Sequence, residues 1–384
     1  MAYNSLRITR NTDDILNGKL LVEAAKEGDD AQILKLLQAG VSVNAEEYNK
    51  SLFYQSENYW TPLQVAVACG HEKATELLIQ AQADLHAKDR FDVTAVHLAA
   101  EKGHKECLHL LLESGADSNA STKYSKAGCY TATPHPGGTT PLHLAAKANH
   151  VECVKELIQN GADYNAVDEL GRTSLYIAAA EGLEECILVH LRNAIGRDIL
   201  SLPVLNTNET PLHCCVRLRM KSCVTALLEH GSDANHRNYS GNTPLHCSIF
   251  HSYNKDSESL DIMKELVLKG FNTDVNLVDG SGFSSLHYVS FSEGRYMERR
   301  PEAAAFLIAY GANTDITNKR GHTLLQNELQ NRLGGDRTIL EAIVKVLPVV
   351  PNLESLNLTH LLTHWFVNMP AFAPQRASFQ MGEA

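Results

Sequence analysis

Two short helical stripes of apolar residues recur along the chain, separated by polar positions. The clearest copy spans residues 139–166 (TTPLHLAAKANHVECVKELIQNGADYNA). Its apolar positions follow helical spacing, first with small residues and then with larger ones: Leu142, Ala145 and Ala146, then Val151, Val154, Leu157 and Ile158. Pro141 suits the first turn of a helix, and Gly161 suits a left-handed helix end. The pattern therefore predicts a unit of helix, short loop, helix and hairpin turn.

The opening segment of this unit, TPLHLAA from Thr140, returns along the chain. Close copies start at Thr61, Thr94, Thr173, Thr210, Thr243 and Ser284, so that successive copies lie 33, 46, 33, 37, 33 and 41 residues apart. The closing element GADYNA also has counterparts, at residues 41–45, 115–120, 231–235 and 311–315. A period in this range indicates stacked repeats, in which no unit buries its apolar face alone.

Taken together, these segments resemble the ankyrin repeat over about residues 17–346. The resemblance implies an all-α solenoid of about nine units, the first and last of them degenerate. It divides the chain into an N-terminal segment (1–16), a repeat domain (17–350) and a C-terminal helix with a flexible tail (351–384). It also implies a non-catalytic scaffold that binds a partner protein through its concave surface and hairpin tips.

Charge and composition limit the partners. The net charge of −11 argues against general binding of nucleic acid or anionic membranes, and it favours basic partner segments. No stretch approaches the roughly 20 apolar residues of a membrane span, and the N-terminus has no apolar export signal. We therefore expect a cytoplasmic or nuclear protein.

Five stretches depart from the period. Residues 46–58 and 121–136 lengthen hairpin connections, whereas residues 252–259 and 292–301 separate the two helices of their units. Residues 193–205 lack the closing element, which predicts a weak joint or bend at the fifth unit. Loops on a rigid scaffold often carry binding residues, so these departures matter for function.

The residue before each leading Thr or Ser is predicted to lie at a hairpin tip. Aromatic and arginine side chains are enriched in binding hot spots, and several occur at or near these positions. The candidate protein-binding residues are Trp60, Phe91, Tyr130, His135, Arg172, Tyr239 and Phe283. The alternative is that some of them pack onto the adjacent repeat or insertion.

The cysteines and histidines follow the repeat register. Cys107, Cys153, Cys186 and Cys223 share one position, where successive copies are about 8–10 Å apart, so they are predicted to be small apolar filling. The fourth residue of TPLH is predicted to be structural, at His97, His143, His213, His246 and His287, and so is the histidine of the G-H pair at His71, His104 and His150. Phosphate-binding and nucleophile motifs are missing, so we predict no catalytic, metal or cofactor site.

Two further expectations come from the resemblance. Asparagines of ankyrin hairpins, here Asn119 and Asn165, can be substrates of an asparagine hydroxylase, but side-chain bonds that hold the hairpin backbone explain them better. Residues 353–367 form an amphipathic pattern that caps the last repeat in one interpretation. In the other, Ser355-Leu356 begins a degenerate SOCS box, with His360 and His364 replacing its Cys and apolar positions, and recruits elongin B/C of a cullin-RING ubiquitin ligase.

Overall fold

The computed structural model describes residues 12–45, 47–50, 57–123, 135–193, 198–250, 258–290 and 300–324. These residues contain eight helix pairs and one additional short helix, α11 (Asp198–Ser201). The pairs are α1 (Thr12–Glu27) with α2 (Asp30–Gln38), α3 (Pro62–Cys69) with α4 (Glu72–Gln80), α5 (Ala95–Lys102) with α6 (Lys105–Glu113), α7 (Pro141–Lys147) with α8 (Val151–Gln159), α9 (Ser174–Ala180) with α10 (Glu184–Asn193), α12 (Pro211–Arg217) with α13 (Lys221–Glu229), α14 (Pro244–Phe250) with α15 (Glu258–Lys269), and α16 (Ser285–Ser290) with α17 (Arg300–Ala309).

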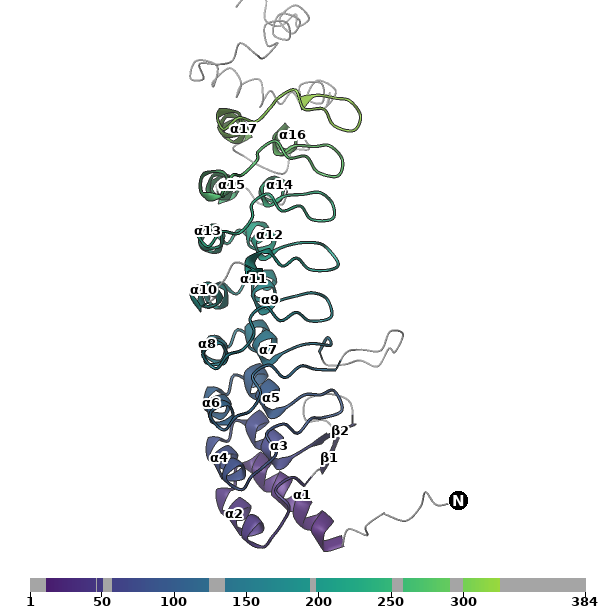
Figure 1. Ribbon diagram of the computed structural model, residues 1–384, viewed down its shortest axis with the longest axis vertical. Helices are drawn as coiled ribbons and strands as arrows, with labels where there is room; N and C mark the ends of the chain where they lie inside the picture. Colours follow the sequence, from purple (N-terminus) through teal and green to yellow (C-terminus); the bar gives the residue numbers. More distant parts are fainter. Residues whose placement is uncertain are drawn as a thin grey trace, which may run out of the picture.

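The pairs stack into an elongated solenoid (Figure 1). First helices form one row, in which α5 packs on α7 and α7 on α9; second helices form another, in which α6 packs on α8 and α8 on α10. The hairpins between units project beside the row of first helices (Figure 1). The predicted all-α repeat solenoid is confirmed, with one addition. The first insertion holds a small antiparallel hairpin of β1 (Glu47–Lys50) and β2 (Glu57–Trp60).

The core lies between the two rows of helices. Leu142, Ala145 and Val154 of the best-formed unit are buried, as the apolar stripes predict. The cysteine column is buried as well, at Cys107, Cys153, Cys186 and Cys223. Burial raises the pKa of the Cys153 thiol to about 11, so that it stays neutral at physiological pH. The prediction of small apolar filling is confirmed.

The ends of the repeat array differ in how far the structure describes them. Helix α1 begins at Thr12, so the first helix starts inside the segment that we expected to precede the repeats. Of the predicted ninth unit only residues 323–324 are described, and the predicted C-terminal helix at residues 353–367 lies outside the described residues.

In the fifth unit α11 stands where the other units have the closing element. Ile199 and Leu200 of this helix are buried, and Val204 follows them into the core. The stack continues past it, since α9 packs on α12 and α10 on α13. Apolar burial thus takes the place of the missing closing element, and the weak joint at this unit stays a prediction.

Candidate functional site: the hairpin-tip edge

We define the tip edge as the row of hairpin tips at residues 89–93, 168–172, 238–242, 279–283 and 318–322. In each tip, one side-chain oxygen accepts hydrogen bonds from the backbone N–H groups two and four residues further on. The distances are 2.8–3.1 Å, and the accepting residues are Asp89, Asp168, Asn238, Asp279 and Asn318. A short polar side chain that bonds its own backbone in this way fixes the conformation of the turn.

Neighbouring tips are joined by one backbone hydrogen bond each. The N–H of Tyr239 donates to the carbonyl of Thr207 at 3.0 Å, and that of Gly280 donates to Ser240 at 2.8 Å. Equivalent bonds run from Lys123 to Phe91, Glu169 to Gly137, Leu205 to Leu170 and Lys319 to Ser281, at 2.8–3.1 Å. The tips therefore form a preorganised edge, which lowers the entropy lost when a partner binds.

The TPLH histidines hold the base of each tip. In the third unit, Nδ1 of His97 accepts the N–H of Thr94 at 3.2 Å, so Nε2 carries the proton and donates to the carbonyl of Thr139 at 3.2 Å. His143, His213 and His246 make the same bond, at 2.9–3.2 Å, to the carbonyls of Arg172, Asn242 and Phe283. Each acceptor is the residue before the next leading Thr or Ser, so the predicted structural role is confirmed for these four histidines.

Burial keeps these rings neutral. It lowers the pKa of His97, His213 and His246 to about 4, and it also lowers the pKa of His143. At neutral pH the histidines act as fixed hydrogen-bond bridges.

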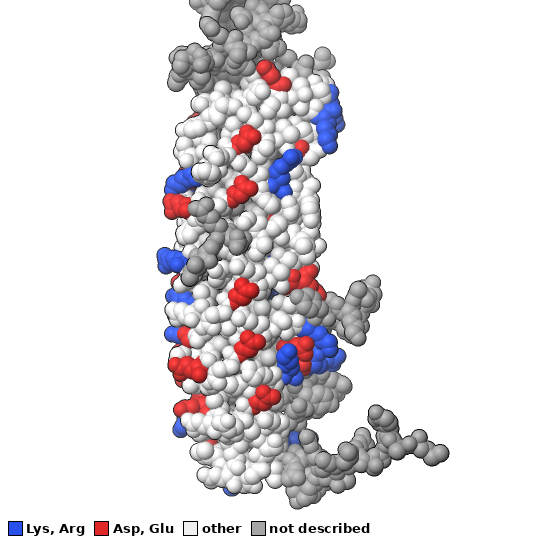
Figure 2. Space-filling view, viewed as in Figure 1, with Lys and Arg blue, Asp and Glu red and all other residues white. Residues whose placement is uncertain are grey.

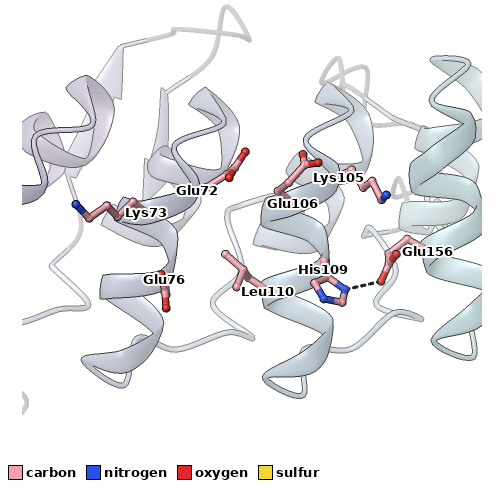
Figure 3. A pocket seen from close by; sticks show the side chains of 8 residues that line it. All are labelled: Glu72, Lys73, Glu76, Lys105, Glu106, His109, Leu110 and Glu156. Carbon is pink, nitrogen blue, oxygen red and sulfur yellow. Dashed lines mark hydrogen bonds and ion pairs between the residues drawn. The ribbon is translucent and has the colours of Figure 1, made fainter.

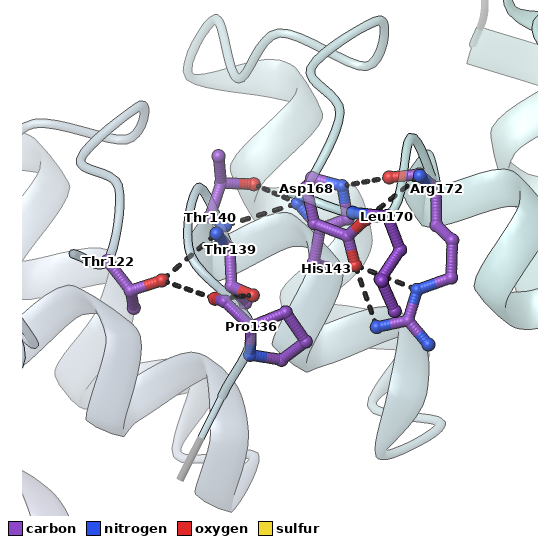
Figure 4. A network of polar contacts seen from close by, with 8 residues as sticks. All are labelled: Thr122, Pro136, Thr139, Thr140, His143, Asp168, Leu170 and Arg172. Carbon is purple, nitrogen blue, oxygen red and sulfur yellow. Dashed lines mark hydrogen bonds and ion pairs between the residues drawn. The ribbon is translucent and has the colours of Figure 1, made fainter. Parts of the chain in front are cut away.

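The base of the second insertion is tied to this network (Figure 4). Thr122 donates its Oγ1–H to the carbonyl of Pro136 at 2.8 Å and accepts the N–H of Thr139 at 3.0 Å. Thr139 also donates its hydroxyl to Pro136 at 2.7 Å. Both ends of the insertion are thus fixed beside the fourth unit.

The G-H histidines link each unit to the one before it. Nε2 of His150 bonds the carbonyl of Glu101 at 3.1 Å, and His71 and His104 bond Lys26 and Ala68 in the same way. The ring of His150 lies over Gly103, which has a φ of +77°; a Cβ added there would be 2.5 Å from Nδ1 of the histidine. Glycine is needed at this position both for its backbone conformation and for the space.

The hairpin asparagines bond the following hairpin rather than their own. Nδ2 of Asn119 donates to the carbonyl of Gly161 at 3.1 Å, and Oδ1 accepts the N–H of Asp163 at 2.7 Å. Asn165 precedes the fifth unit, which lacks the closing element, and its Oδ1 is buried without a hydrogen-bond partner in the described part of the chain. Side-chain bonding explains Asn119, but it does not explain Asn165.

Three of the candidate binding residues are buried, which corrects their expected exposure. Trp60 is only 4% exposed, because its Nε1–H donates at 3.4 Å to Oδ2 of Asp89, the oxygen that the hairpin leaves available. Phe91 is 8% exposed, with the guanidinium of Arg90 above its ring at 4.9 Å. His135 is 7% exposed, and its Nε2 lies 3.8 Å from a carboxylate oxygen of Glu101. These side chains stabilise the scaffold, as the alternative of packing onto neighbouring repeats predicts.

The other candidates differ among themselves. Arg172 forms an ion pair with buried Asp168, at 2.7 Å between Nη2 and Oδ2, and its side chain is 30% exposed. Phe283 is half-buried against the rings of His287 and Tyr288. Tyr239 is 68% exposed and is the most accessible of the candidates that lie within the described residues. Tyr130 lies outside the described residues.

Sequence reasoning missed the charge of the tips, because it used only the net charge. Exposed cations gather on the tip edge in two groups, Lys88, Arg90 and Lys123 near the N-terminal end, and Arg237, Lys319 and Arg320 near the C-terminal end. Carboxylates instead form a column along the neighbouring face (Figure 2). We define the aspartate column as five exposed aspartates that each follow the end of a second helix by four or five residues: Asp84, Asp117, Asp163, Asp233 and Asp274. The expectation that the acidic chain favours basic partner segments stays a prediction, and the exposed cations of the tip edge have the opposite sign.

A groove of about 540 Å³ lies on the other side of the solenoid, between the second helices (Figure 3). His109 at its edge contacts Glu156 at 2.8 Å and Glu113 at 3.1 Å, and the hydrogen bond to Glu156 raises the pKa of the imidazole. Lys73 pairs with Asp30 outside the groove at 3.4 Å. The other lining residues are Glu72, Glu76, Lys105, Glu106 and Leu110. This groove is a solvated surface of mixed charge, and we assign it no chemistry.

Comparison with known proteins agrees with this geometry. The family described as ankyrin repeats, in three copies, matches residues 21–122, 125–199 and 192–276. The chain belongs to the ankyrin-repeat family, whose members are generally non-catalytic protein-interaction scaffolds.

Individual relatives match over shorter stretches. The chain is 26% identical over 151 residues to an ankyrin repeat-containing protein of Schizosaccharomyces pombe, covering 39% of this chain and 62% of the relative. It is 28% identical over 145 residues to human neurogenic locus notch homolog protein 1, covering 31% of this chain and 5% of that protein. It is 30% identical over 175 residues to the human transient receptor potential cation channel subfamily A member 1, covering 44% of this chain and 14% of that protein. The matches thus span less than two thirds of these relatives, and they concern the repeats.

Two observations describe the rest of the surface. Within the described ranges, no three His, Cys, Asp or Glu side chains gather closely enough to hold a metal ion. Among the helices of those same ranges, none combines the length and apolar character that a membrane crossing requires.

Proposed function

We propose that this chain is an adaptor that binds a partner protein along its tip edge, with Tyr239 as an anchor. The exposure of Tyr239 on a rigid hairpin carries this proposal. Its backbone N–H is fixed to Thr207, while its ring is 68% exposed. A rigid, exposed aromatic ring offers a large contact area at little entropic cost, which is why tyrosine is frequent in binding hot spots.

The test compares Tyr239→Ala with a matched loss of an aromatic ring elsewhere. Phe271, which follows α15, is 81% exposed and lies away from the tip edge. Affinity capture from cell lysate with the full chain is expected to lose specific partners for Tyr239→Ala and to keep them for Phe271→Ala. Both variants should melt within a few degrees of the wild type, because neither ring is buried. An unchanged set of partners for Tyr239→Ala contradicts the proposal.

Trp60→Ala serves as the contrasting variant. Its ring is buried, so its removal is expected to cost about 3–5 kcal/mol of unfolding free energy. Any loss of partners in this variant should accompany a lower melting temperature. That correlation separates scaffold residues from binding residues.

The alternative function, recruitment of substrates to a ubiquitin ligase, depends on residues 353–367 outside the described ranges. It remains a prediction, and a pull-down with elongin B/C tests it directly. Loss of elongin from the chain cut after Pro351 would support it, whereas full-length chain that captures no elongin would exclude it.

A further inference from the structure

We propose that the last three described tips bind an extended acidic segment of a partner protein. The C-terminal tip patch consists of Arg237, Tyr239, Lys319 and Arg320. This inference rests on the proposed function and gives it a specific partner chemistry.

The three tips beneath this patch form one fixed platform. A Cβ added to Gly241, which has a φ of +80°, would lie only 2.4 Å from the backbone N of Gly280 in the next tip. The next two tips also approach closely, since a Cβ added to Gly282 would lie 2.8 Å from the backbone N of Lys319. Tips that approach so closely, and that share the backbone bonds described above, hold the cations above them at fixed separations.

The cations of the patch are not neutralised by the described part of the chain. Arg237 is positioned by two carbonyls, through Nη2 to Val278 at 2.6 Å and Nε to Gly241 at 3.3 Å. Lys319 and Arg320 are exposed and have no carboxylate within ion-pair distance among the described residues. The carboxylate of this platform, Asp279, is buried and already accepts two backbone N–H groups and, at 2.6 Å, the hydroxyl of Tyr288. The patch therefore offers positive charge that an anionic partner can complement.

The spacing of the tips matches an extended polypeptide. Stacked helices lie about 10 Å apart, so the first and third tips are separated by about 20 Å. An extended chain rises about 3.3 Å per residue, and six residues span that distance. Side chains six positions apart point to the same side of an extended chain. Acidic residues with this spacing would meet Arg237 and the Lys319–Arg320 pair together, with Tyr239 available to an apolar side chain.

The width of the patch favours a single chain over larger polyanions. Carboxylates line the face adjacent to the cationic edge (Figure 2). A nucleic-acid duplex or a flat anionic membrane would bring further negative charge toward these carboxylates. One extended peptide can follow the tips without meeting them.

The experiment measures fluorescence anisotropy of a labelled Gly-Ser peptide with two glutamate pairs about six residues apart, mixed with the full chain. We expect Lys319→Glu with Arg320→Glu to weaken binding about tenfold or more. We expect Tyr239→Ala to weaken binding severalfold if the linker carries one leucine. The matched control, Lys88→Glu with Lys123→Glu, reverses two equally exposed charges at the other end of the edge and should leave affinity unchanged. A peptide with the glutamate pairs about three residues apart should bind more weakly, since it cannot reach both outer tips.

Several results would overturn the inference. One is equal loss of affinity in the two charge-reversal variants; another is no loss in Lys319→Glu with Arg320→Glu. Tighter binding of duplex DNA or of phosphatidylserine vesicles than of the peptide would reject a polypeptide ligand. If captured partners depend on Tyr239 but not on Lys319 and Arg320, the acidic chemistry is wrong and the proposed function stands. If they do not depend on Tyr239 at all, the proposed function itself fails.

Discussion

The contact between Gly103 and His150 predicts a specific cost for Gly103→Ala. An alanine in the left-handed conformation costs about 1–2 kcal/mol. The added Cβ, 2.5 Å from Nδ1 of His150, also forces the ring to move and lose its 3.1 Å bond to Glu101, which is worth about 1 kcal/mol. We therefore expect Gly103→Ala to lower the free energy of unfolding by about 2–3 kcal/mol.

Gly161 provides the control for the backbone part of this cost. Its φ is +79°, close to that of Gly103, but a Cβ placed on it has no neighbour within 4 Å. Gly161→Ala should therefore cost only about 1–2 kcal/mol. The entropy that alanine removes from the unfolded chain is the same in both variants, so it cancels in the comparison.

Urea unfolding followed by circular dichroism measures the difference, with the slope of the transition checked because repeat arrays can lose cooperativity. In the background of His150→Ala, the extra cost of Gly103→Ala should disappear, which gives a coupling of about 1 kcal/mol. Equal losses for Gly103→Ala and Gly161→Ala, or no coupling to His150, would refute the role of this contact.

Three other perturbations follow from the same links. Asn119→Ala removes two bonds to the next hairpin and should cost about 1–3 kcal/mol in urea unfolding, whereas Asn165→Ala, whose Oδ1 has no such bond, should cost clearly less. Burial lowers the pKa of His97 to about 4, whereas the same ring in the unfolded chain has a pKa of about 6.5. The contribution of this neutral ring to the free energy of unfolding is therefore full above pH 6.5 and falls as the pH drops toward 4. His97→Gln should retain the structure and reduce this pH dependence, because Gln64 already makes the corresponding bonds to Thr61 and Val93; an unchanged slope of the melting temperature against pH would contradict this. Ile199→Ala empties a fully buried site in α11 and should lower the free energy of unfolding by about 2–5 kcal/mol. A loss below about 1 kcal/mol would show that α11 does not replace the missing closing element in stabilising the fifth unit.

The sequence predicts the scaffold well because the repeat register constrains every unit in the same way. The burial of Cys153 and the bridging role of His97 follow from their positions in the repeat, before any coordinates are known. Propensity and periodicity are most informative where local and global preferences agree. The predicted units between residues 61 and 290 correspond to the observed helix pairs for this reason.

The exposure of individual tip residues depends on contacts that the register does not specify. Trp60, the residue before Thr61, lies beside Asp89 of the next tip, and its Nε1–H donates to Oδ2 of that aspartate. The equivalent Oδ2 of Asp168 accepts a hydrogen bond from Nε of Arg172 in its own tip, and that of Asp279 accepts the hydroxyl proton of Tyr288. A signal for this pairing was present, since the tip aspartate recurs with the repeat. Only the geometry identifies which neighbour supplies the donor.

The charge of the tips could have been found by sorting Lys and Arg according to the repeat register. The net charge of −11 averages over faces, and the acidic residues of the aspartate column hide the cations of the edge. Lys319 and Arg320 occupy the same hairpin positions as Tyr239 and Ser240, so their place on the edge follows from alignment alone.

The fifth unit lacks two of the polar links that recur in other units, the TPLH histidine and the hairpin asparagine, and it lies between the two cationic groups of the tip edge. Tyr176 takes the place of the TPLH histidine, and the closing element that would carry the next asparagine is absent. The unit keeps a turn at residues 204–209, which bonds the tip before it through Leu205 and Leu170 and the tip after it through Thr207 and Tyr239, and it buries the side chains of α11, including Ile199. Apolar packing holds neighbouring repeats together, but it fixes the angle between them less strictly than paired hydrogen bonds do. The C-terminal tip patch follows α11 in the chain and lies on tips joined to one another directly, and Arg237 and Tyr239 also bond Asn208 and Thr207 of the preceding turn. Its affinity for an acidic segment should therefore be insensitive to changes at the fifth unit, while any partner that spans both cationic groups should be sensitive to them.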